Sequence, residues 1–310
     1  LVMGSILLAF LPIITIVVIG YLFSRIGLFP ENVGSGLVQF VYWLAIPAML
    51  FLHMFQTDIS ENIPLTFLLS FYVPSIFVFI LAMILFNRVF GWDAKELGVA
   101  GIVSSYGNLA LLGLPILLAV TNDQVALLPA LVLLATQSTV LFTFTIVTLN
   151  SFKGLDKGVF KAVFCRLATN PIVLALIFGL AFNIFQVPLS SEAMYTLNIL
   201  GDAAPGCALV ALGASLGTYK LKKPGKEVLC FVLLRNFIHP LLVWGVALFF
   251  GLDGAWLTVA VLFAAMPVGI NAFIFSESYD IRQSTVSVTL VVSTLVSSAT
   301  IPILLYLLPL

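Results

Sequence analysis

Two short segments of this 310-residue chain combine glycine, asparagine and proline within long apolar runs. The residues concerned are Gly107, Asn108 and Pro115 in the first segment, and Pro267, Gly269 and Asn271 in the second. Proline lacks an N–H and clashes with the carbonyl four residues earlier, and glycine lets the backbone leave helical geometry at little cost. We therefore predict that a helix is interrupted in each segment, with the carbonyls of Leu111 and Phe263 losing their helical partners.

Such interruptions would create a site for a small organic anion. The N-terminal end of a half-helix presents N–H groups and a positive partial charge, which suit a carboxylate. The side chains of Asn108 and Asn271 can donate further hydrogen bonds without burying a full charge. A simple proline kink filled by a neighbouring helix is the alternative, but two matched breaks favour a site. We predict substrate contacts from Gly107, Asn108, Pro115, Gln137, Arg235, Pro267, Gly269 and Asn271.

Arg235, Asp202 and Gln137 are polar residues that lie deep within apolar runs. A charge at the bilayer centre costs about 2.5–3.5 kcal/mol on insertion scales, so it usually pairs or faces a cavity. Arg235 could attract the substrate, pair with Asp202, or extend toward the basic residues 220–226. Asp202 could take part in cation coupling or could pack and cap a helix. Gln137 could contact the substrate or hydrogen-bond a neighbouring helix.

Glu277 and His53 lie near the ends of apolar runs and are candidates for coupling or gating. Glu277 could gate or bind a cation, although a solvated helix end is the favoured interpretation. His53 could relay protons, although an interfacial hydrogen bond is favoured for it. The coupling ion, Na⁺ or H⁺ if there is one, is not specified by these residues.

The sequence offers little support for catalysis. The segment Gly213-Ala-Ser-Leu-Gly217 matches a hydrolase motif, but that motif requires a strand-to-helix turn, and small residues in an apolar helix indicate close helix packing. There is no zinc-protease motif and no phosphate-binding loop, and the three cysteines are scattered. We expect no enzymatic activity, no metal and no cofactor.

Composition identifies the environment in which these residues work. Hydrophobic residues make up 62% of the chain and charged residues 8%, whereas soluble domains are typically about 25% charged. The balanced charge, 13 basic and 13 acidic residues, argues against a nucleic-acid partner. Apolar runs too long for a barrel predict an all-α membrane protein of ten transmembrane helices. The expected spans are 4–24, 34–53, 64–88, 96–120, 124–149, 162–184, 190–218, 227–251, 254–276 and 284–308.

The loops predict an orientation. Twelve of the 13 basic residues fall in or beside alternate loops, and Arg235 is the exception. The other loops contain acidic residues and no basic ones. By the positive-inside rule, the basic loops are cytoplasmic and both termini face outward.

The two halves of the chain resemble each other. Pro12 and Pro171 are each followed by a glycine eight residues later, at an offset of 159 residues, and Pro47 and Pro205 have a similar offset of 158. A unit of five crossings must insert its second copy upside down, which is the inverted repeat of secondary transporters. We predict a first repeat over 1–150, a linker over 151–160 and an inverted second repeat over 161–310, with helices 4 and 9 broken. Chance similarity between leucine-rich helices is the alternative.

The chain resembles a bacterial member of the auxin efflux carrier family, which includes the plant PIN auxin exporters and bacterial malate or malonate permeases. The resemblance rests on Gly107-Asn108…Gly113-Leu-Pro115, Asn170-Pro171…Gly179-Leu, Leu212-Gly213-Ala-Ser-Leu-Gly217 and Met266-Pro267…Phe275-Ser-Glu277-Ser-Tyr279. It implies broken helices that cross at their prolines. It also implies a transport domain of spans 3–5 and 8–10 that moves against the other spans, and a substrate-binding asparagine beside each break. Asn108 precedes its proline by seven residues and Asn271 follows its own by four, so Asn271 is the weaker match.

We therefore expect a multi-pass protein of the inner cell membrane that moves a small mono- or dicarboxylate, auxin-like or malate/malonate-like. The expected mechanism is alternating access, of elevator type, and the resemblance suggests a homodimer in the lipid bilayer. A sodium-coupled organic-anion symporter of the bile-acid type is the nearest alternative. A membrane sensor or channel is an alternative from another class.

Overall fold

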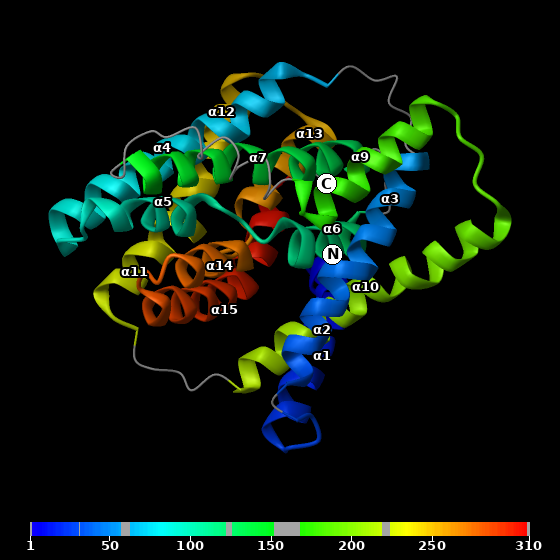
Figure 1. Ribbon diagram of the computed structural model, residues 1–310, viewed down its shortest axis with the longest axis horizontal. Coiled ribbons are helices and arrows are strands. Elements are labelled where there is room, and N and C mark those ends of the chain that lie inside the picture. Colours follow the sequence, from blue (N-terminus) through cyan, green and yellow to red (C-terminus); the bar gives the residue numbers. More distant parts are fainter. Residues whose placement is uncertain are drawn as a thin grey trace. The chain divides into compact units, whose positions relative to one another are not determined.

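The computed structural model describes residues 2–30, 32–56, 63–121, 126–151, 168–218 and 224–308 (Figure 1). Within these ranges the regular structure is helical, and the sole β-type pairing is an isolated antiparallel bridge between Gly107 and Val268. Six of the described helices are long and apolar enough to cross a bilayer, and four shorter apolar helices accompany them. The predicted all-α membrane class is confirmed. The ten crossings and their inverted relation remain predictions.

The chain forms two compact units, each drawing on both halves of the sequence. Unit 1 comprises Leu1–Asn62, Ala110–Ala135 and Ala168–Lys220, and unit 2 comprises Ile63–Leu109, Thr136–Leu167 and Leu221–Leu310. Unit 2 thus gathers predicted spans 3, 8, 9 and 10 with parts of spans 4 and 5. That grouping follows closely the transport domain implied by the family resemblance.

Unit 1 consists of helices that pack in close pairs, chiefly α1 with α10 and α3 with α9. Its elements are α1 (Val2–Arg25), α2 (Val33–Phe40), the π-helix η1 (Val41–Ala45), α3 (Ile46–Gln56), part of the π-helix η3 (Leu109–Gly113), α6 (Leu114–Val120), the first part of α7 (Leu127–Ser151), α9 (Pro171–Ile184) and α10 (Ser191–Thr218). The predicted linker 151–160 lies almost entirely outside the described residues.

Glycines let α1 and α10 approach until their backbones touch. A Cβ on Gly20 would collide with the Val210 carbonyl, and a Cβ on Gly213 would collide with the Val17 carbonyl. Small residues at membrane helix interfaces serve this purpose. The glycine-rich segment that matches a hydrolase motif therefore contributes to helix packing, as predicted.

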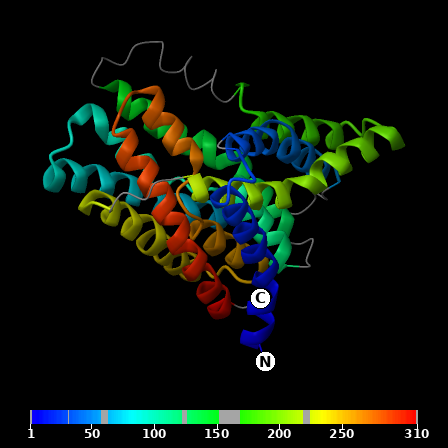
Figure 2. The ribbon, with the colours of Figure 1, turned by 90° about the horizontal axis from the view of Figure 1, so that it is seen from below.

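Unit 2 surrounds an aromatic and aliphatic core. Its elements are α4 (Leu65–Phe90), the 3-10 helix η2 (Ala94–Glu96), α5 (Leu97–Ser105), the second part of α7, α11 (Lys226–Leu233), the π-helix η5 (Leu234–Ile238), α12 (His239–Phe249), α13 (Gly254–Ala264), α14 (Ile270–Ser278) and α15 (Gln283–Leu307). Phe86 and Phe231 stack with ring centroids 4.0 Å apart, and Trp92 packs edge-on against Phe86 at 4.8 Å. Helix α15 packs against α11 and α14 (Figures 1 and 2).

Both predicted interruptions are present, but the first lies earlier than expected. Helix α5 ends at Ser105 and the chain becomes helical again at Leu109, while Pro115 sits in the first turn of α6. Pro115 lies in a continuous helical run, just after the π-helical turn η3. The break occurs at residues 106–108, which include the predicted Gly107 and Asn108 but lie before Pro115. In the second segment, residues 265–269 separate α13 from α14 and contain Pro267 as predicted. We call these two non-helical stretches the crossing.

Candidate functional site

The backbones of the two stretches pair with each other inside unit 2. The Asn108 N–H donates to the Pro267 carbonyl at 2.9 Å, and the Gly269 N–H donates to the Tyr106 carbonyl at 2.9 Å. This exchange satisfies polar groups that would otherwise be costly at membrane depth. The family resemblance implied a crossing at two prolines. In the structure the bridge joins Gly107 of the first stretch to Val268 of the second, and Pro267 precedes Val268.

Two glycines allow this approach. A Cβ on Gly107 would collide with the guanidinium of Arg235. A Cβ on Gly269 would lie 2.5 Å from the ring of Tyr106 and 2.9 Å from the Gly107 carbonyl oxygen. Both separations are shorter than real side chains tolerate, so the crossing requires glycine at both positions.

Gln137 holds the first stretch in place from α7. Its Oε1 accepts from the Gly107 N–H at 3.3 Å, and its Nε2 donates to the Gly107 carbonyl at 3.0 Å. The side chain is buried and serves both backbone groups of one residue. Of the two alternatives for Gln137, the structure supports hydrogen bonding to a neighbouring segment.

The second stretch is held by a polar cluster that sequence reasoning missed. Ser293 on α15 accepts from the Val268 N–H at 3.0 Å and donates to Oδ1 of Asn236 at 2.8 Å. Asn236 in turn donates to Oγ of Ser297 at 2.6 Å. The available signal was the spacing of four between two serines of one apolar helix, which places both on the same face.

Asn108 and Asn271 both lie beside the crossing, with half-buried side chains. Counted from the bridged pair Gly107 and Val268, they follow by one and by three residues, so they are closer to equivalence than their distances from the prolines suggested. Nδ2 of Asn271 donates to the hydroxyl of Tyr106 at 2.9 Å. A residue of the first stretch therefore orients the asparagine of the second.

The N–H groups within the crossing are largely occupied by protein acceptors. Those of Asn108 and Gly269 pair across the crossing, and those of Gly107 and Val268 bond to side chains. The first turn of a helix has N–H groups that lack helical acceptors. In the second segment that turn begins at Ile270.

Arg235 reaches the crossing from η5, and its side chain is fully buried. Nε donates to the Met266 carbonyl at 3.0 Å, Nη1 to the Ser105 carbonyl at 3.0 Å, and Nη2 to the Phe263 carbonyl at 3.4 Å. The Phe263 carbonyl, which Pro267 cannot serve, thus obtains a donor from a side chain. The side chain therefore points into unit 2, and residues 219–223, part of the basic segment toward which it could extend, lie outside the described residues.

The remaining predicted residues lie elsewhere. Pro115, His53 and Asp202 belong to unit 1. His53 is half-buried and interacts electrostatically with Asp202, whose side chain is exposed. Glu277 is exposed in the last turn of α14, in agreement with the favoured solvated helix end. None of these four residues belongs to the crossing, and their predicted roles remain predictions.

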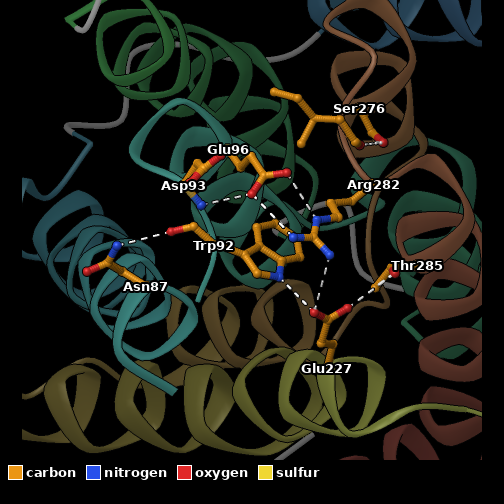
Figure 3. Close-up of polar contacts among 9 residues, drawn as sticks. Asn87, Trp92, Asp93, Glu96, Glu227, Ser276, Arg282 and Thr285 are labelled. Atoms are coloured by element: carbon orange, nitrogen blue, oxygen red, sulfur yellow. Dashed lines mark hydrogen bonds and ion pairs between the residues drawn. The ribbon is translucent and has the colours of Figure 1, made fainter. Parts of the chain in front are cut away.

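A second polar cluster joins the two interrupted segments at the ends that lie away from the crossing (Figure 3). Arg282, which follows α14, lies 3.0 Å from Oε1 of Glu96, which precedes α5. The same guanidinium lies 3.8 Å from Oε1 of Glu227 and 5.0 Å from the ring centre of Trp92. Trp92 donates its indole N–H to Glu227 at 2.8 Å. Two loops that the charge pattern assigns to one side of the membrane are thus in contact.

This ion cluster shifts the titration of its members. Burial raises the pKa of Glu96, but hydrogen bonding to Arg282 and to the Asp93 N–H outweighs burial, and the pKa falls below its usual range. The hydrogen bond that Arg282 donates to Glu96 also raises the pKa of Arg282 above its usual value. Glu96 therefore remains a carboxylate under all but acidic conditions.

Comparison with known proteins agrees with this architecture. The family model described as membrane transport protein matches residues 5–158 and 153–305. A protein of Rhizobium meliloti named "Putative malonate transporter" is 29% identical over 306 residues, covering 96% of this chain and 94% of that protein. The uncharacterized transporter YfdV of Escherichia coli K12 is 23% identical over 303 residues, covering 96% and 95%. Auxin efflux carrier component 6 of Arabidopsis thaliana is 29% identical over 149 residues, covering 46% and 26%. The chain is a multi-pass membrane protein that belongs to the membrane transport protein family, the auxin efflux carrier family that its motifs predicted.

Proposed function

We propose that this protein is a secondary transporter that moves a small carboxylate across the cell membrane by alternating access. The observation that carries the proposal is the crossing itself. Two interrupted helices meet in one compact unit, their backbones pair there, and an asparagine lies beside each stretch. Membrane proteins tolerate irregular backbone at depth where it is enclosed by protein or lines a cavity. In secondary transporters, substrate sites lie at such interruptions.

We place the carboxylate beside the crossing within unit 2. We assign it to the side chains of Asn108 and Asn271 and to the backbone N–H groups at the start of α14. Amide donors and helix N-termini stabilise an anion without a fixed charge that the protein would have to desolvate between transport cycles. Gly107, Gly269, Pro267, Gln137 and Arg235 shape this site. Pro115 limits the hydrogen bonding of the turn that follows the first break.

Movement of unit 2 relative to unit 1 would give an elevator-type cycle. The chain passes between the units within η3, at Leu109 and Ala110, and within α7, at Ala135 and Thr136. A π-helical turn is a frequent place for local distortion at functional sites. We assign the bending to η3. Two inverted five-helix repeats over 1–150 and 161–310, with both termini outside and two copies per assembly, complete the proposed architecture.

The substrate class is the least specified part of the proposal. The relative from Rhizobium meliloti is named for malonate and the one from Arabidopsis thaliana for auxin, and both compounds carry a carboxylate. A mono- or dicarboxylate of that size suits a site of two asparagines and one helix N-terminus.

Uptake by reconstituted protein tests the proposal. Liposomes containing the purified chain should accumulate one or more of radiolabelled malonate, malate, succinate and indole-3-acetate, whereas protein-free liposomes should not. Asn108→Ala and Asn271→Ala should each lower uptake roughly tenfold, since each removes a hydrogen bond to a charged ligand worth about 1.5–3 kcal/mol.

Asn198→Ala is the matched control. That asparagine lies exposed on α10 and hydrogen-bonds the Met194 carbonyl of its own helix, so uptake should remain at the wild-type rate. Transport that survives Asn108→Ala unchanged, or a chain that moves no carboxylate of the panel, would overturn the proposal. Ion currents without substrate accumulation would indicate a channel instead.

A further inference from the structure

The C-terminal ends of α5 and α13 bring several carbonyl oxygens together beside the crossing. The last carbonyls of a helix lack helical donors and carry a negative partial charge. The carbonyls of Ser105, Phe263 and Met266 all face the guanidinium of Arg235. Such clusters of helix ends and unwound carbonyls are what Na⁺-coupled transporters use to coordinate the ion.

Arg235 meets the chemical demand that a bound cation would meet. A guanidinium is permanently positive and has five N–H donors and no acceptor. Three of these donors go to carbonyls of the two helix ends, and Nη1 also lies 2.6 Å from Nδ1 of His239. Four of the five donors are therefore engaged by acceptors of the protein itself. The positive charge lies against the helix ends and is not available to bind the substrate directly.

Hydrogen bonds through His239 and Ser75 keep the guanidinium in place. Because arginine can only donate, Nδ1 of His239 accepts, and the ring proton belongs on Nε2, which lies 2.8 Å from Oγ of Ser75. The Ser75 hydroxyl in turn donates a hydrogen bond to the Phe71 carbonyl. Nδ1 also lies 3.2 Å from the Ala264 carbonyl, but a hydrogen bond there would require the other tautomer, which Arg235 excludes. The chain of donors is complete with a neutral imidazole.

Gly107 leaves exactly the space that the guanidinium fills, since any side chain there would collide with it. The cation and the tightest part of the crossing are therefore built against each other. We propose that the Arg235 guanidinium is a resident cation of the crossing, so that carboxylate transport by this protein requires no Na⁺ at this position. The inference rests on the proposed carboxylate transport and concerns its coupling ion. Arg235 acts here as a positioning residue that offsets the negative helix ends.

The first test compares wild-type uptake of malonate, or of whichever carboxylate the panel identifies, in Na⁺ and in choline media of equal ionic strength. Equal rates in the two media are expected. Uptake that requires Na⁺ would overturn the inference.

The second test replaces the cation. Arg235→Ala leaves several acceptors unpaired and should slow uptake roughly tenfold or more and lower the melting temperature. Millimolar guanidinium, or Na⁺ at higher concentration, should restore part of both, because either cation can enter the vacated space. Arg235→Lys keeps the charge without the fork and should retain intermediate uptake. Urea at the concentration used for guanidinium should restore nothing.

Arg282→Ala is the matched control, because it removes an exposed arginine of unit 2 that is paired with half-buried carboxylates. Guanidinium should not change its uptake. If the wild-type chain transports no carboxylate, the proposed function fails, but the melting temperatures of Arg235→Ala with and without guanidinium still decide the role of Arg235. Loss of stability that no cation restores would overturn the resident-cation role. If Arg235→Ala does not fold, Arg235→Lys and the wild-type ion dependence decide it.

Discussion

The stretch that follows α5 is three residues long and contains no proline, whereas the stretch that follows α13 is five residues long and has Pro267 near its centre. Both nevertheless place one bridged residue, Gly107 or Val268, against an acceptor from a later helix. Gln137 on α7 serves Gly107, and Ser293 on α15 serves Val268. The comparison teaches that hydrogen-bond satisfaction is the shared requirement and that different residues meet it in the two stretches.

The two stretches also differ in what their supports provide. Gln137 serves both the N–H and the carbonyl of its residue, while Ser293 serves an N–H and depends on Asn236 for its own orientation. The first stretch is therefore held by one amide and the second by a network. Removing single side chains should expose this difference.

The largest effect is expected from Gln137→Met, which keeps the side-chain volume but leaves two buried backbone groups unpaired, at about 1–3 kcal/mol each. Ser293→Ala removes the acceptor of the Val268 N–H and the donor to Oδ1 of Asn236. It should cost less, because the Asn236 side chain can turn to another partner and the backbone of Gly107 cannot. Melting temperatures in detergent and uptake rates in liposomes measure both. Thr143→Ala, which removes a hydrogen bond within α7, should change little. A larger cost for Ser293→Ala than for Gln137→Met would break the comparison.

Alanine at the two glycines of the crossing should come next. Gly107→Ala must displace the guanidinium of Arg235, and Gly269→Ala must displace the ring of Tyr106. Overpacking of this kind costs about 1–3 kcal/mol. We expect uptake to fall more for Gly107→Ala, because its collision moves a charge. Gly245→Ala on α12, where a Cβ meets open space, should behave as wild type, and equal uptake by all three variants would contradict the geometry.

A smaller effect is expected from Tyr106→Phe, which removes the hydroxyl that orients Asn271 across the crossing. Loss of one hydrogen bond worth about 1 kcal/mol should raise the apparent KM for the carboxylate roughly fivefold with little change in the maximal rate. Tyr72→Phe loses a comparable hydroxyl contact, to Thr136, and is the control. An unchanged KM would mean that Asn271 needs no help from the first stretch.

The smallest effect is expected at the ends of the interrupted segments that lie away from the crossing, where Glu96 pairs with Arg282. The folded pKa of Glu96 lies below its unfolded value, so its stabilisation is complete above the unfolded value and is lost as the pH falls through the folded value. Glu96→Gln should therefore cost about 1 kcal/mol or less at neutral pH and nothing in strong acid. Melting temperatures across the acidic range measure this. In an Arg282→Gln background the difference should shrink to the part that the Asp93 N–H contributes, and an undiminished difference there would rule out the pair as the cause.

The sequence predicted much of the crossing because composition and backbone chemistry are local properties. The apolar runs located the helical segments, and glycine with asparagine and proline located both interruptions. The first break falls at Gly107 and Asn108 and not at Pro115, because a proline can follow a π-helical turn within a helical run, and a sequence does not show where that turn lies.

The supports of the crossing were beyond local reasoning. Arg235 contacts the Ser105 carbonyl, which lies 130 residues away in the chain. From the sequence it could equally attract the substrate, pair with Asp202 or extend toward residues 220–226. In the sequence, Asn236 and Ser293 do not differ from other polar residues of membrane helices. What distinguishes them is their hydrogen-bond connection to the Val268 N–H, which belongs to a distant segment. Such partners are fixed by tertiary packing and not by the residue's neighbours in sequence.

The glycine contact between α1 and α10 in unit 1 has a consequence for how the protein responds to heat. Two helices joined through Gly20 and Gly213 meet backbone to backbone, and little side-chain rotamer freedom is gained when they separate. Backbone amides along that seam should therefore exchange with deuterium among the slowest in unit 1, and warming should loosen the side-chain-rich pairs of the same unit first.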